Sequence, residues 1–364
     1  MQAIDRALKW AKRRERPLSA VSLAGGFAFD SYTFGRIDRP ATQLVFIVYL
    51  LVAGVSIAAQ HVLESRPEGR KAPEKIRTIL LFVTQFALGC LLSGFCVFYI
   101  RSAAIEASWP FLLVMATIFI ANEYLRRYHS RLVFSALLFF LSLYSYAILL
   151  VPVVVAQIGP LPFLASGAIA CILFFLYMRA LARLGHDRYR SARSQIAIGV
   201  AIITVVLNGS YFLKILPPLP LALSDAGVYH SIRRAGADYQ ATEEAEPAAW
   251  QALFGTFPVE HVQAGARLYA YSAIFAPYRL STRIEHHWEW RNPATGAWSL
   301  QQTIPIAIRG GREEGFRAYS VKTEPRPGAW RVDITTGDGR AIGRIRFSVE
   351  LQAVPPALNP KVLK

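Results

Sequence analysis

Residues 132–157 read LVFSALLFFLSLYSYAILLVPVVVAQ, a stretch without a single charged side chain. A helix needs about 20 apolar residues to cross the hydrocarbon core of a bilayer, and this stretch is long enough. Similar apolar stretches lie at 18–35, 41–60, 76–99, 108–125, 161–182 and 196–216. The chain therefore predicts a membrane all-α bundle of about seven transmembrane helices over residues 17–216.

The loops between these stretches alternate between basic and nearly uncharged. With seven spans, the N-terminal segment and the loops on its side of the membrane carry 19 Lys and Arg, whereas the opposite short loops carry only Arg36, Arg39 and Arg101. Cytoplasmic loops are enriched in Lys and Arg, so the N-terminus is predicted to be cytoplasmic and the C-terminal part to lie outside. A cleaved signal peptide at 18–29 would leave six spans and the same outside location.

Composition agrees with a membrane protein and argues against nucleic-acid binding. The 364 residues are 54% hydrophobic and carry a net charge of +16. Up to Leu223 there are 23 Lys and Arg against 10 Asp and Glu, and from Ser224 onward 17 against 14. The basic excess thus belongs to the membrane loops, and the remaining part lacks the basic footprint of a phosphate-binding domain. Cys90, Cys96 and Cys171 all fall inside predicted spans and indicate neither a disulfide framework nor a zinc site.

Two flanking segments complete the membrane half. Residues 1–16 form either an amphipathic basic helix at the membrane interface or a polar cytoplasmic tail. Pro217, Pro218 and Pro220 end the last span, because proline cannot continue a helix, and predict a stiff linker over 217–227. A periplasmic β-sandwich domain is expected at 228–352 and a tail at 353–364.

Polar side chains inside spans are costly and are therefore functional candidates. Asp30, Gln85 and Asn208 are of this kind; Asp30 is expected to pair with Arg36 or Arg39. Gln85 and Asn208 fit interhelical hydrogen bonds better than transport. Asn122 and Glu123 lie near a span end, where Glu123 fits a pair with the arginines that follow it. No charge lies in the middle of a span, unlike in most ion-coupled transporters.

The C-terminal part changes to a period of two. Apolar and polar residues alternate over 303–308, 330–335 and 344–349, which is typical of half-buried strands. Gly337-Asp338-Gly339 is a hairpin signal, and Pro305 indicates an edge strand. About six or seven short strands predict an all-β, immunoglobulin-like antiparallel sandwich.

Two histidines lie next to each other on one predicted strand. Ile284, His286, Trp288 and Trp290 share the face expected in the core, where aromatic packing is favoured over a sugar-binding platform. Glu285, His287, Glu289 and Arg291 share the other face. Three ligands on one flat strand converge poorly on a metal, so we predict a solvated charged face, no metal and no cofactor, and a hydrogen-bonded core role for His286.

A set of arginines offers the best candidate for ligand binding. They lie on predicted outward positions or flank a glycine-rich turn, and would suit an anionic glycan or a lipid headgroup; an ordinary solvated face explains them equally well. The candidate ligand-binding residues are Arg312, Arg317, Tyr319, Arg331, Arg344 and Arg346.

Several motifs resemble a known family. They are FAP at 275–277, IEHHW at 284–288, GGR at 310–312, GFRAYS at 315–320, GAWRV at 328–332 and IGRIRF at 342–347, with GGF at 25–27 and RID at 36–38 in the N-terminal half. Together they resemble the bacterial domain of unknown function 2914. The resemblance implies a bacterial inner-membrane protein with a periplasmic domain. It implies no activity and no catalytic residues.

These observations favour a non-enzymatic inner-membrane protein whose periplasmic β-domain binds an envelope glycan, an anionic lipid or a protein partner. A permease or lipid exporter is the first alternative and would need a cavity lined by groups such as Gln85 and Asn208. A membrane-embedded transferase on a lipid-linked substrate is the second. The sequence lacks the paired acids, nucleophile elbow and phosphate-binding loop that would support it.

Overall fold

The computed structural model describes residues 27–32, 34, 36–65, 73–102, 104–124, 132–184, 186–236, 238–244, 257–312 and 315–363. The chain forms two compact units. A helical unit comprises Met1–Ile100, Trp109–Val155 and Pro160–Leu213, and a β unit comprises Lys214–Lys364 with the short segments Arg101–Ser108 and Ala156–Gly159. The predicted amphipathic segment 1–16 and most of the first predicted span lie outside the described residues.

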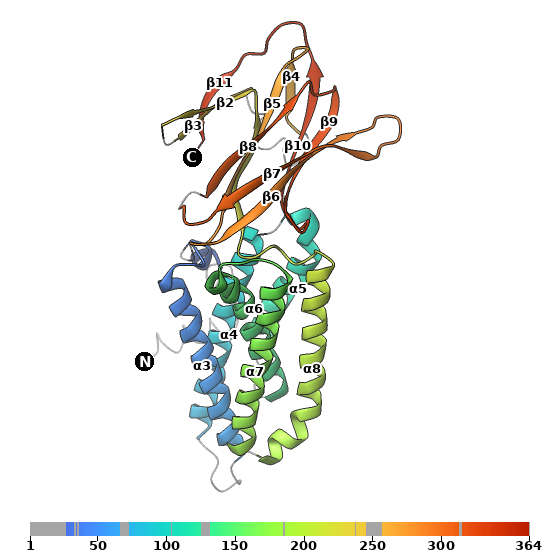
Figure 1. The fold of residues 1–364 in the computed structure, drawn as a ribbon. Coiled ribbons are helices and arrows are strands. Elements are labelled where there is room, and N and C mark those ends of the chain that lie inside the picture. The colour runs from blue at the N-terminus through green and yellow to red at the C-terminus, as the bar shows by residue number, and fades with distance from the viewer. Residues whose placement is uncertain are drawn as a thin grey trace, which may run out of the picture. The chain divides into compact units, whose positions relative to one another are not determined.

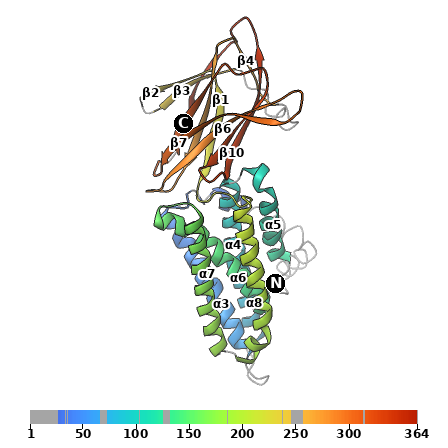
Figure 2. The same ribbon diagram turned by 45° about the vertical axis from the view of Figure 1, so that its right-hand side comes forward.

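Long helices make up the described part of the helical unit, and consecutive helices run in opposite directions (Figures 1 and 2). They are α3 (Pro40–Glu64), α4 (Glu74–Ser102), α5 (Ile105–Tyr124), α6 (Leu132–Val155), α7 (Pro160–Leu184) and α8 (His186–Phe212). By length and composition, α3, α4, α6, α7 and residues Tyr189–Phe212 of α8 are able to cross a bilayer, and α5 has a shorter apolar run, Ala107–Asn122. The predicted apolar helical half is confirmed with five such helices in the described residues.

Small and polar residues hold the helices together. Gln60 of α3 donates to Thr84 of α4, whose hydroxyl bonds Ser56 at 2.8 Å. Tyr177 of α7 donates to the carbonyl of Gly54 on α3 at 2.8 Å. A Cβ at Gly54 would lie 3.3 Å from the ring of Phe139, so the absence of a side chain there helps α3 to approach α6. Helices in lipid associate through such close approaches and hydrogen bonds, because lipid provides no hydrophobic drive between them.

The β unit contains one five-stranded sheet and two three-stranded sheets. The strands are β1 (Ala222–Tyr229), β2 (Ser231–Ala235), β3 (Asp238–Glu243), β4 (Val259–Val262), β5 (Arg267–Phe275), β6 (Ser281–Arg291), β7 (Trp298–Arg309), β8 (Phe316–Thr323), β9 (Gly328–Thr336), β10 (Ala341–Leu351) and β11 (Asn359–Leu363). The sheet orders are β1-β5-β8, β4-β10-β9-β6-β7 and β11-β3-β2. All pairs are antiparallel except β4 with β10, which is parallel.

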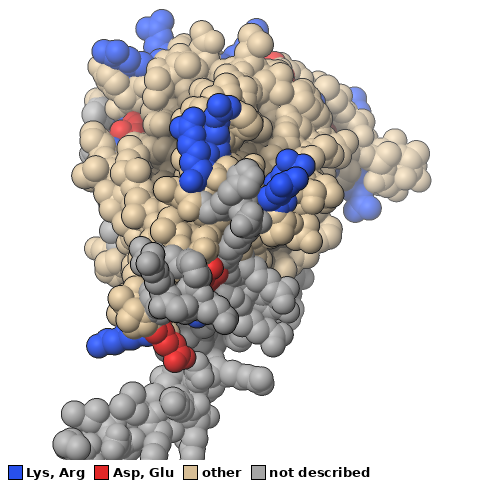
Figure 3. Space-filling model, turned by 90° about the horizontal axis from the view of Figure 1, so that it is seen from below, with Lys and Arg blue, Asp and Glu red and all other residues tan. Residues whose placement is uncertain are grey.

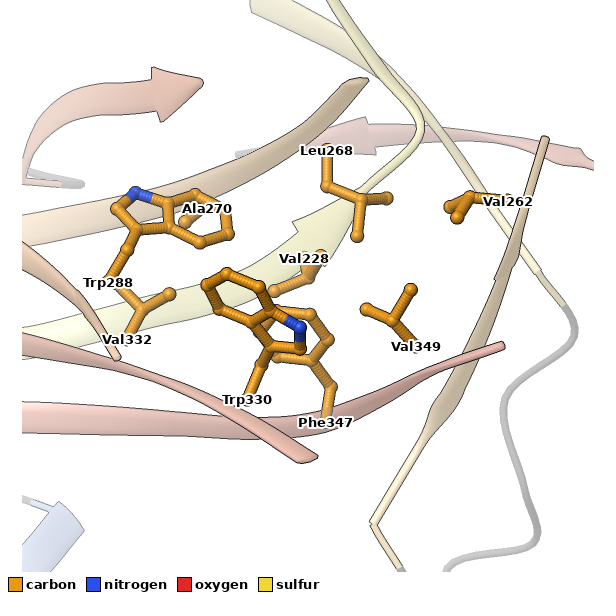
Figure 4. Close-up of a cluster of buried hydrophobic side chains, with 9 residues drawn as sticks. All are labelled: Val228, Val262, Leu268, Ala270, Trp288, Trp330, Val332, Phe347 and Val349. Carbon is orange, nitrogen blue, oxygen red and sulfur yellow. The ribbon is translucent and has the colours of Figure 1, made fainter. Parts of the chain in front are cut away.

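The five-stranded sheet and the β1-β5-β8 sheet share a hydrophobic core (Figure 4). Trp288 of β6, Trp330 of β9 and Phe347 of β10 project from the five-stranded sheet, and Val228 and Leu268 come from β1 and β5. The indole rings of Trp288 and Trp330 meet edge to face, with centroids 6.4 Å apart. The tryptophans therefore pack the core, as the alternation predicted, and the apolar faces of the two sheets exclude water between them.

Two local predictions about strands are confirmed. Pro305 lies in β7, which is the edge strand of its sheet, the position in which a strand tolerates proline. Gly337-Asp338-Gly339 connects β9 to β10 as an antiparallel hairpin.

The structure differs from the sequence predictions at both ends of the β unit. Residues 217–220 form a buried turn rather than an extended spacer, with Leu221 N–H bonded to the carbonyl of Pro218. Strand β1 begins at Ala222, inside the predicted linker, and the predicted tail contains β11, which pairs with β3. Eleven strands are described instead of six or seven: β1 and β3 lack the regular alternation of the later strands, and β2, β4 and β11 are only four or five residues long.

Candidate functional site

Two of the three predicted intramembrane polar residues, Asn208 and Gln85, form hydrogen bonds with a neighbouring helix. Asn208 of α8 donates to the hydroxyl of Tyr144 on α6 at 3.0 Å and to the carbonyl of Thr204. The buried Gln85 of α4 accepts, through its backbone carbonyl, a hydrogen bond from Asn122. Asp30 lies in the helical segment 27–32. The ion pair seen beside it joins Arg36 to Asp38 at 2.7 Å.

Sequence reasoning missed two further buried polar residues, Gln60 and His61. It ended the span at residue 60, whereas α3 continues to Glu64. His61 is 1% exposed, and its Nε2 lies 3.1 Å from the carbonyl of Leu181 on α7. Both side chains connect helices, which is a structural role.

Three of the predicted ligand-binding arginines lie together on strands β9 and β10. Arg346 is opposite Arg331 in the ladder, and Arg344 is opposite Asp333. Arg344 contacts both carboxylate oxygens of Asp333, at 2.5 and 2.6 Å, and Arg331 lies 2.5 Å from Glu289. Two of the three guanidinium groups are thus neutralised by neighbouring carboxylates.

The other three candidates belong to the opposite sheet or its edge. Arg312 precedes β8 and lies over the ring of Phe316. Arg317 of β8 pairs with Asp238 at 3.3 Å. Tyr319, also on β8, is 40% exposed and lies about 6 Å from the rings of Tyr239 and Tyr269. The six predicted residues therefore form two groups on different sheets.

The two adjacent histidines divide between the core and the outer face, as predicted. His286 is fully buried and bonds Ser272 and Ser320 at 2.9 and 2.8 Å. His287 lies on the outer face, 3.2 Å from Glu285 and 3.1 Å from Thr335.

A cluster that the sequence did not indicate lies where β1, β3 and β4 end or begin. His230 occupies the turn between β1 and β2, Glu244 follows β3, and Glu260 lies in β4. The backbone N–H of His230 bonds the carbonyl of Thr242, which aligns this turn with the end of β3. One ligand atom from each of the three side chains lies within 4.8 Å of the others. We call these three residues the His–Glu cluster.

The cluster concentrates buried negative charge around one imidazole. Nε2 of His230 lies 3.0 Å from Oε1 of Glu244 and 3.1 Å from Oε2 of Glu260. Burial favours the neutral form of His230, but the two carboxylates outweigh it, so its pKa lies above the ordinary value. His261 forms an outer contact, with Nδ1 2.7 Å from Oε2 of Glu244, and this hydrogen bond raises the pKa of His261.

An imidazole and two carboxylates are a donor set that could hold a divalent cation. Its three members come from separate segments, 14 and 16 residues apart in sequence. Such spacing matches no local metal motif, and only the pairing of the strands reveals the cluster.

Comparison with known proteins supports the resemblance seen in the C-terminal motifs. Residues 281–349 match the family described as protein of unknown function (DUF2914). This match spans β6 to β10 and contains the core tryptophans, the hairpin and all five candidate arginines. No curated protein sequence matches the chain.

Similar solved structures are distant. An immunoglobulin-like protein from Pseudomonas aeruginosa is 9% identical over 36% of this chain and 98% of its own, with a TM-score of 0.21. A β-glucosidase from Listeria innocua in complex with isofagomine is 8% identical over 34% of this chain and 18% of its own, with a TM-score of 0.18. The DNA glycosylase AlkC from Pseudomonas fluorescens, bound to DNA, is 9% identical over 86% of this chain and 99% of its own, with a TM-score of 0.23. At these TM-scores, none carries information on function.

Proposed function

We propose that this chain is a multi-pass protein of the bacterial inner membrane whose β unit lies in the periplasm and binds an envelope ligand or partner. It acts as a scaffold or sensor rather than as an enzyme. The observation that carries the proposal is the distribution of basic residues between the two ends of the helices.

Because consecutive helices run in opposite directions, alternate loops lie at the same end of the helical unit. The α7–α8 turn lies at the opposite end of the helical unit from the α6–α7 turn and from the point where the chain leaves α8. Close to the α7–α8 turn, four arginines are exposed: Arg179, Arg183, Arg190 and Arg193. The view of this end in Figure 3 has more blue Lys and Arg side chains than red acidic ones.

The segments at the other end carry fewer basic residues. The α6–α7 turn, residues 156–159, has no Lys or Arg, and Arg36 before α3 pairs with Asp38. The other basic residues described at this end are Arg39, Arg101 and Lys214. Since Lys and Arg accumulate in cytoplasmic loops, this asymmetry supports a cytoplasmic α7–α8 turn. The β unit, which follows α8, then belongs outside the cytoplasm. This asymmetry is found on the described helices and is independent of the first predicted span.

Within the β unit, the β8 side is the better candidate for ligand binding. Tyr319 is exposed beside Tyr239 and Tyr269, and Arg312 precedes the same strand. Arg317 lies over the ring of Tyr239 and pairs with Asp238, whose side chain is 56% exposed. An aromatic surface with such arginines suits an anionic sugar or headgroup. In the group on β9 and β10, Arg331 pairs with Glu289, and Arg344 pairs with Asp333. A ligand would have to compete with these carboxylates. Arg346, which lies over the ring of Phe257, remains part of that second candidate group.

Fusions to two reporters test the location. A reporter that fluoresces only in the cytoplasm is expected to stay dark when fused at Lys364, whereas a periplasm-dependent phosphatase fused there is active. The matched control is a fusion truncated at residue 185, in the α7–α8 turn, for which the opposite pattern is expected. Fluorescence from the Lys364 fusion would overturn the proposal.

Ligand binding is tested separately on the full-length protein in micelles. Arg312→Ala with Tyr319→Ala is compared with Arg331→Ala with Arg346→Ala for retention of envelope glycans, anionic lipid vesicles and crosslinked proteins. The first pair is expected to lose binding, and the second to retain it. Equal retention by both pairs and the unaltered protein would exclude these surfaces.

A further inference from the structure

We propose that His230, Glu244 and Glu260 bind one divalent cation of the zinc class. This site is independent of the proposed envelope function, because it uses none of the candidate arginines or tyrosines. Three observations carry it: the spacing of the donor atoms, a buried carboxylate oxygen without a hydrogen bond, and the absence of a Lys or Arg partner among the described residues.

The donor atoms are spaced as a tetrahedral ion requires. Zinc lies about 2.0 Å from carboxylate oxygen and imidazole nitrogen, so two ligands of a tetrahedral site are about 3.3 Å apart. Nε2 of His230 lies 3.0 Å from Glu244 and 3.1 Å from Glu260. The two carboxylate oxygens lie within 4.8 Å of each other, so a cation between the three donors would draw these oxygens to about the same spacing.

The buried carboxylate of Glu260 has an oxygen without a hydrogen bond from the described residues. The residue is 7% exposed, and its buried Oε2 accepts no hydrogen bond from the described residues. This oxygen faces Nε2 of His230, which already contacts Glu244. A buried carboxylate oxygen without a hydrogen bond is costly, and coordination of a cation would satisfy it.

The negative charge of the two carboxylates in the cluster also favours binding of a cation. Among the described residues, no Lys or Arg forms an ion pair with Glu244 or Glu260. The ion pairs of these two carboxylates in the described residues are with His230 and His261. With a neutral imidazole as ligand, two carboxylates carry a charge of about −2, which one divalent ion neutralises.

The donor types select the class of metal. Calcium and magnesium take oxygen ligands, whereas imidazole favours zinc and other first-row transition ions. His261 is a positioning residue: its Nδ1 and its backbone N–H both contact the carboxylate of Glu244 and hold that side chain towards His230. Outer contacts of this kind orient metal ligands.

The test uses the full-length protein without an affinity tag, in detergent micelles, stripped with a chelator and titrated with zinc chloride. We expect uptake of one zinc ion per chain. His230→Gln and Glu260→Gln should each weaken binding by more than about 100-fold, and His261→Gln by about 10- to 100-fold. Calcium chloride should not displace the zinc.

The control pair is His287 with Glu285, whose side chains lie 3.2 Å apart and lack a third ligand. His287→Gln and Glu285→Gln should bind zinc as the unaltered protein does. X-ray absorption of the zinc-loaded unaltered protein needs no variant to fold, and should show one imidazole among oxygen ligands. Absence of zinc uptake, retention of zinc by both His230→Gln and Glu260→Gln, or a spectrum with two or more imidazoles would overturn the proposal.

Discussion

Nδ1 of His286 lies 2.8 Å from the hydroxyl oxygen of Ser320 in the buried core of the β unit. The same oxygen accepts a hydrogen bond from the indole of Trp288 at 2.9 Å, and Nε2 of His286 contacts the hydroxyl of Ser272. A neutral imidazole has one donor and one acceptor nitrogen, so two hydroxyl groups satisfy it. The pair shows how one polar residue is accommodated between two apolar sheets.

This arrangement predicts a loss of stability in acid. Burial, with a smaller effect of His287, lowers the pKa of His286 from 6.5 to about 4. Between these values the unfolded chain binds a proton that the folded chain does not, so the free energy of unfolding falls as the pH drops below about 6.5. The expected loss is about 3 kcal/mol by pH 4.

Urea unfolding of the full chain in micelles, followed by tryptophan fluorescence at several pH values, measures this loss. His286→Gln keeps a donor and an acceptor but cannot titrate, so its stability should depend less on pH. Identical pH profiles for the variant and the unaltered protein would contradict the assignment. The comparison also cancels the titration of other histidines.

Gly310 allows two backbone segments to approach closely. A Cβ there would clash with the carbonyl oxygen of Pro277 and would lie 2.7 Å from that of Ala276. Because these obstacles are backbone atoms, Gly310→Ala should destabilise the β unit by about 3 kcal/mol or more, at the upper end of overpacking costs. Gly337→Ala is the control, since its nearest atoms would be 3.7 Å away. Comparable melting temperatures for the two variants would contradict the prediction.

Arg344 and Asp333 should be coupled through the β9–β10 ladder. Both side chains are largely buried, and two short contacts join them. A double-mutant cycle with Arg344→Ala and Asp333→Ala is expected to give a coupling free energy of about 1 kcal/mol, measured by urea unfolding. A value near zero would mean that Asp333 does not hold Arg344, which would leave its charge available for a ligand.

Close packing of α6 and α7 depends on Gly167. A Cβ at this position would meet the hydroxyl of Tyr144 and lie 2.9 Å from its ring carbon Cζ. Gly167→Val should lower the midpoint of detergent-induced unfolding, because small residues permit helices in membranes to approach. Gly209→Ala on α8 is the control, as its Cβ would have no neighbour within 4 Å. An unchanged midpoint for Gly167→Val would show that α6 and α7 can separate without cost.

An element could be predicted from the sequence where its apolar and polar residues follow a regular pattern. Strands β6, β7, β9 and β10 alternate between buried and outward residues, so their faces were readable from sequence. Strands β1 and β3 have irregular burial and were not recognised as strands. Hydropathy predicted that one span ends at Gln60, although Gln60 and His61 are both buried in α3. A hydropathy scale takes no account of the hydrogen-bond partners that these two side chains have on α4 and α7.

For the candidate sites, sequence alone identified residue types but not their neighbours. The outward arginines were recognised, whereas the carboxylates Glu289 and Asp333 that pair with Arg331 and Arg344 became evident only from the strand register. The two groups of candidate residues were likewise separated only by the order of strands in the sheets.

The sequence by itself determined the apolar helical half, the unequal distribution of basic residues and the alternating strands near the C-terminus. Each depends on residues close together in the chain, on the length of an apolar run or on the period of a strand. Only the tertiary structure decided that His230, Glu244 and Glu260 meet, because their approach depends on how β1, β3 and β4 are positioned in separate sheets. A site built from distant segments depends on tertiary contacts, and no pattern of neighbouring residues in the sequence reveals these contacts.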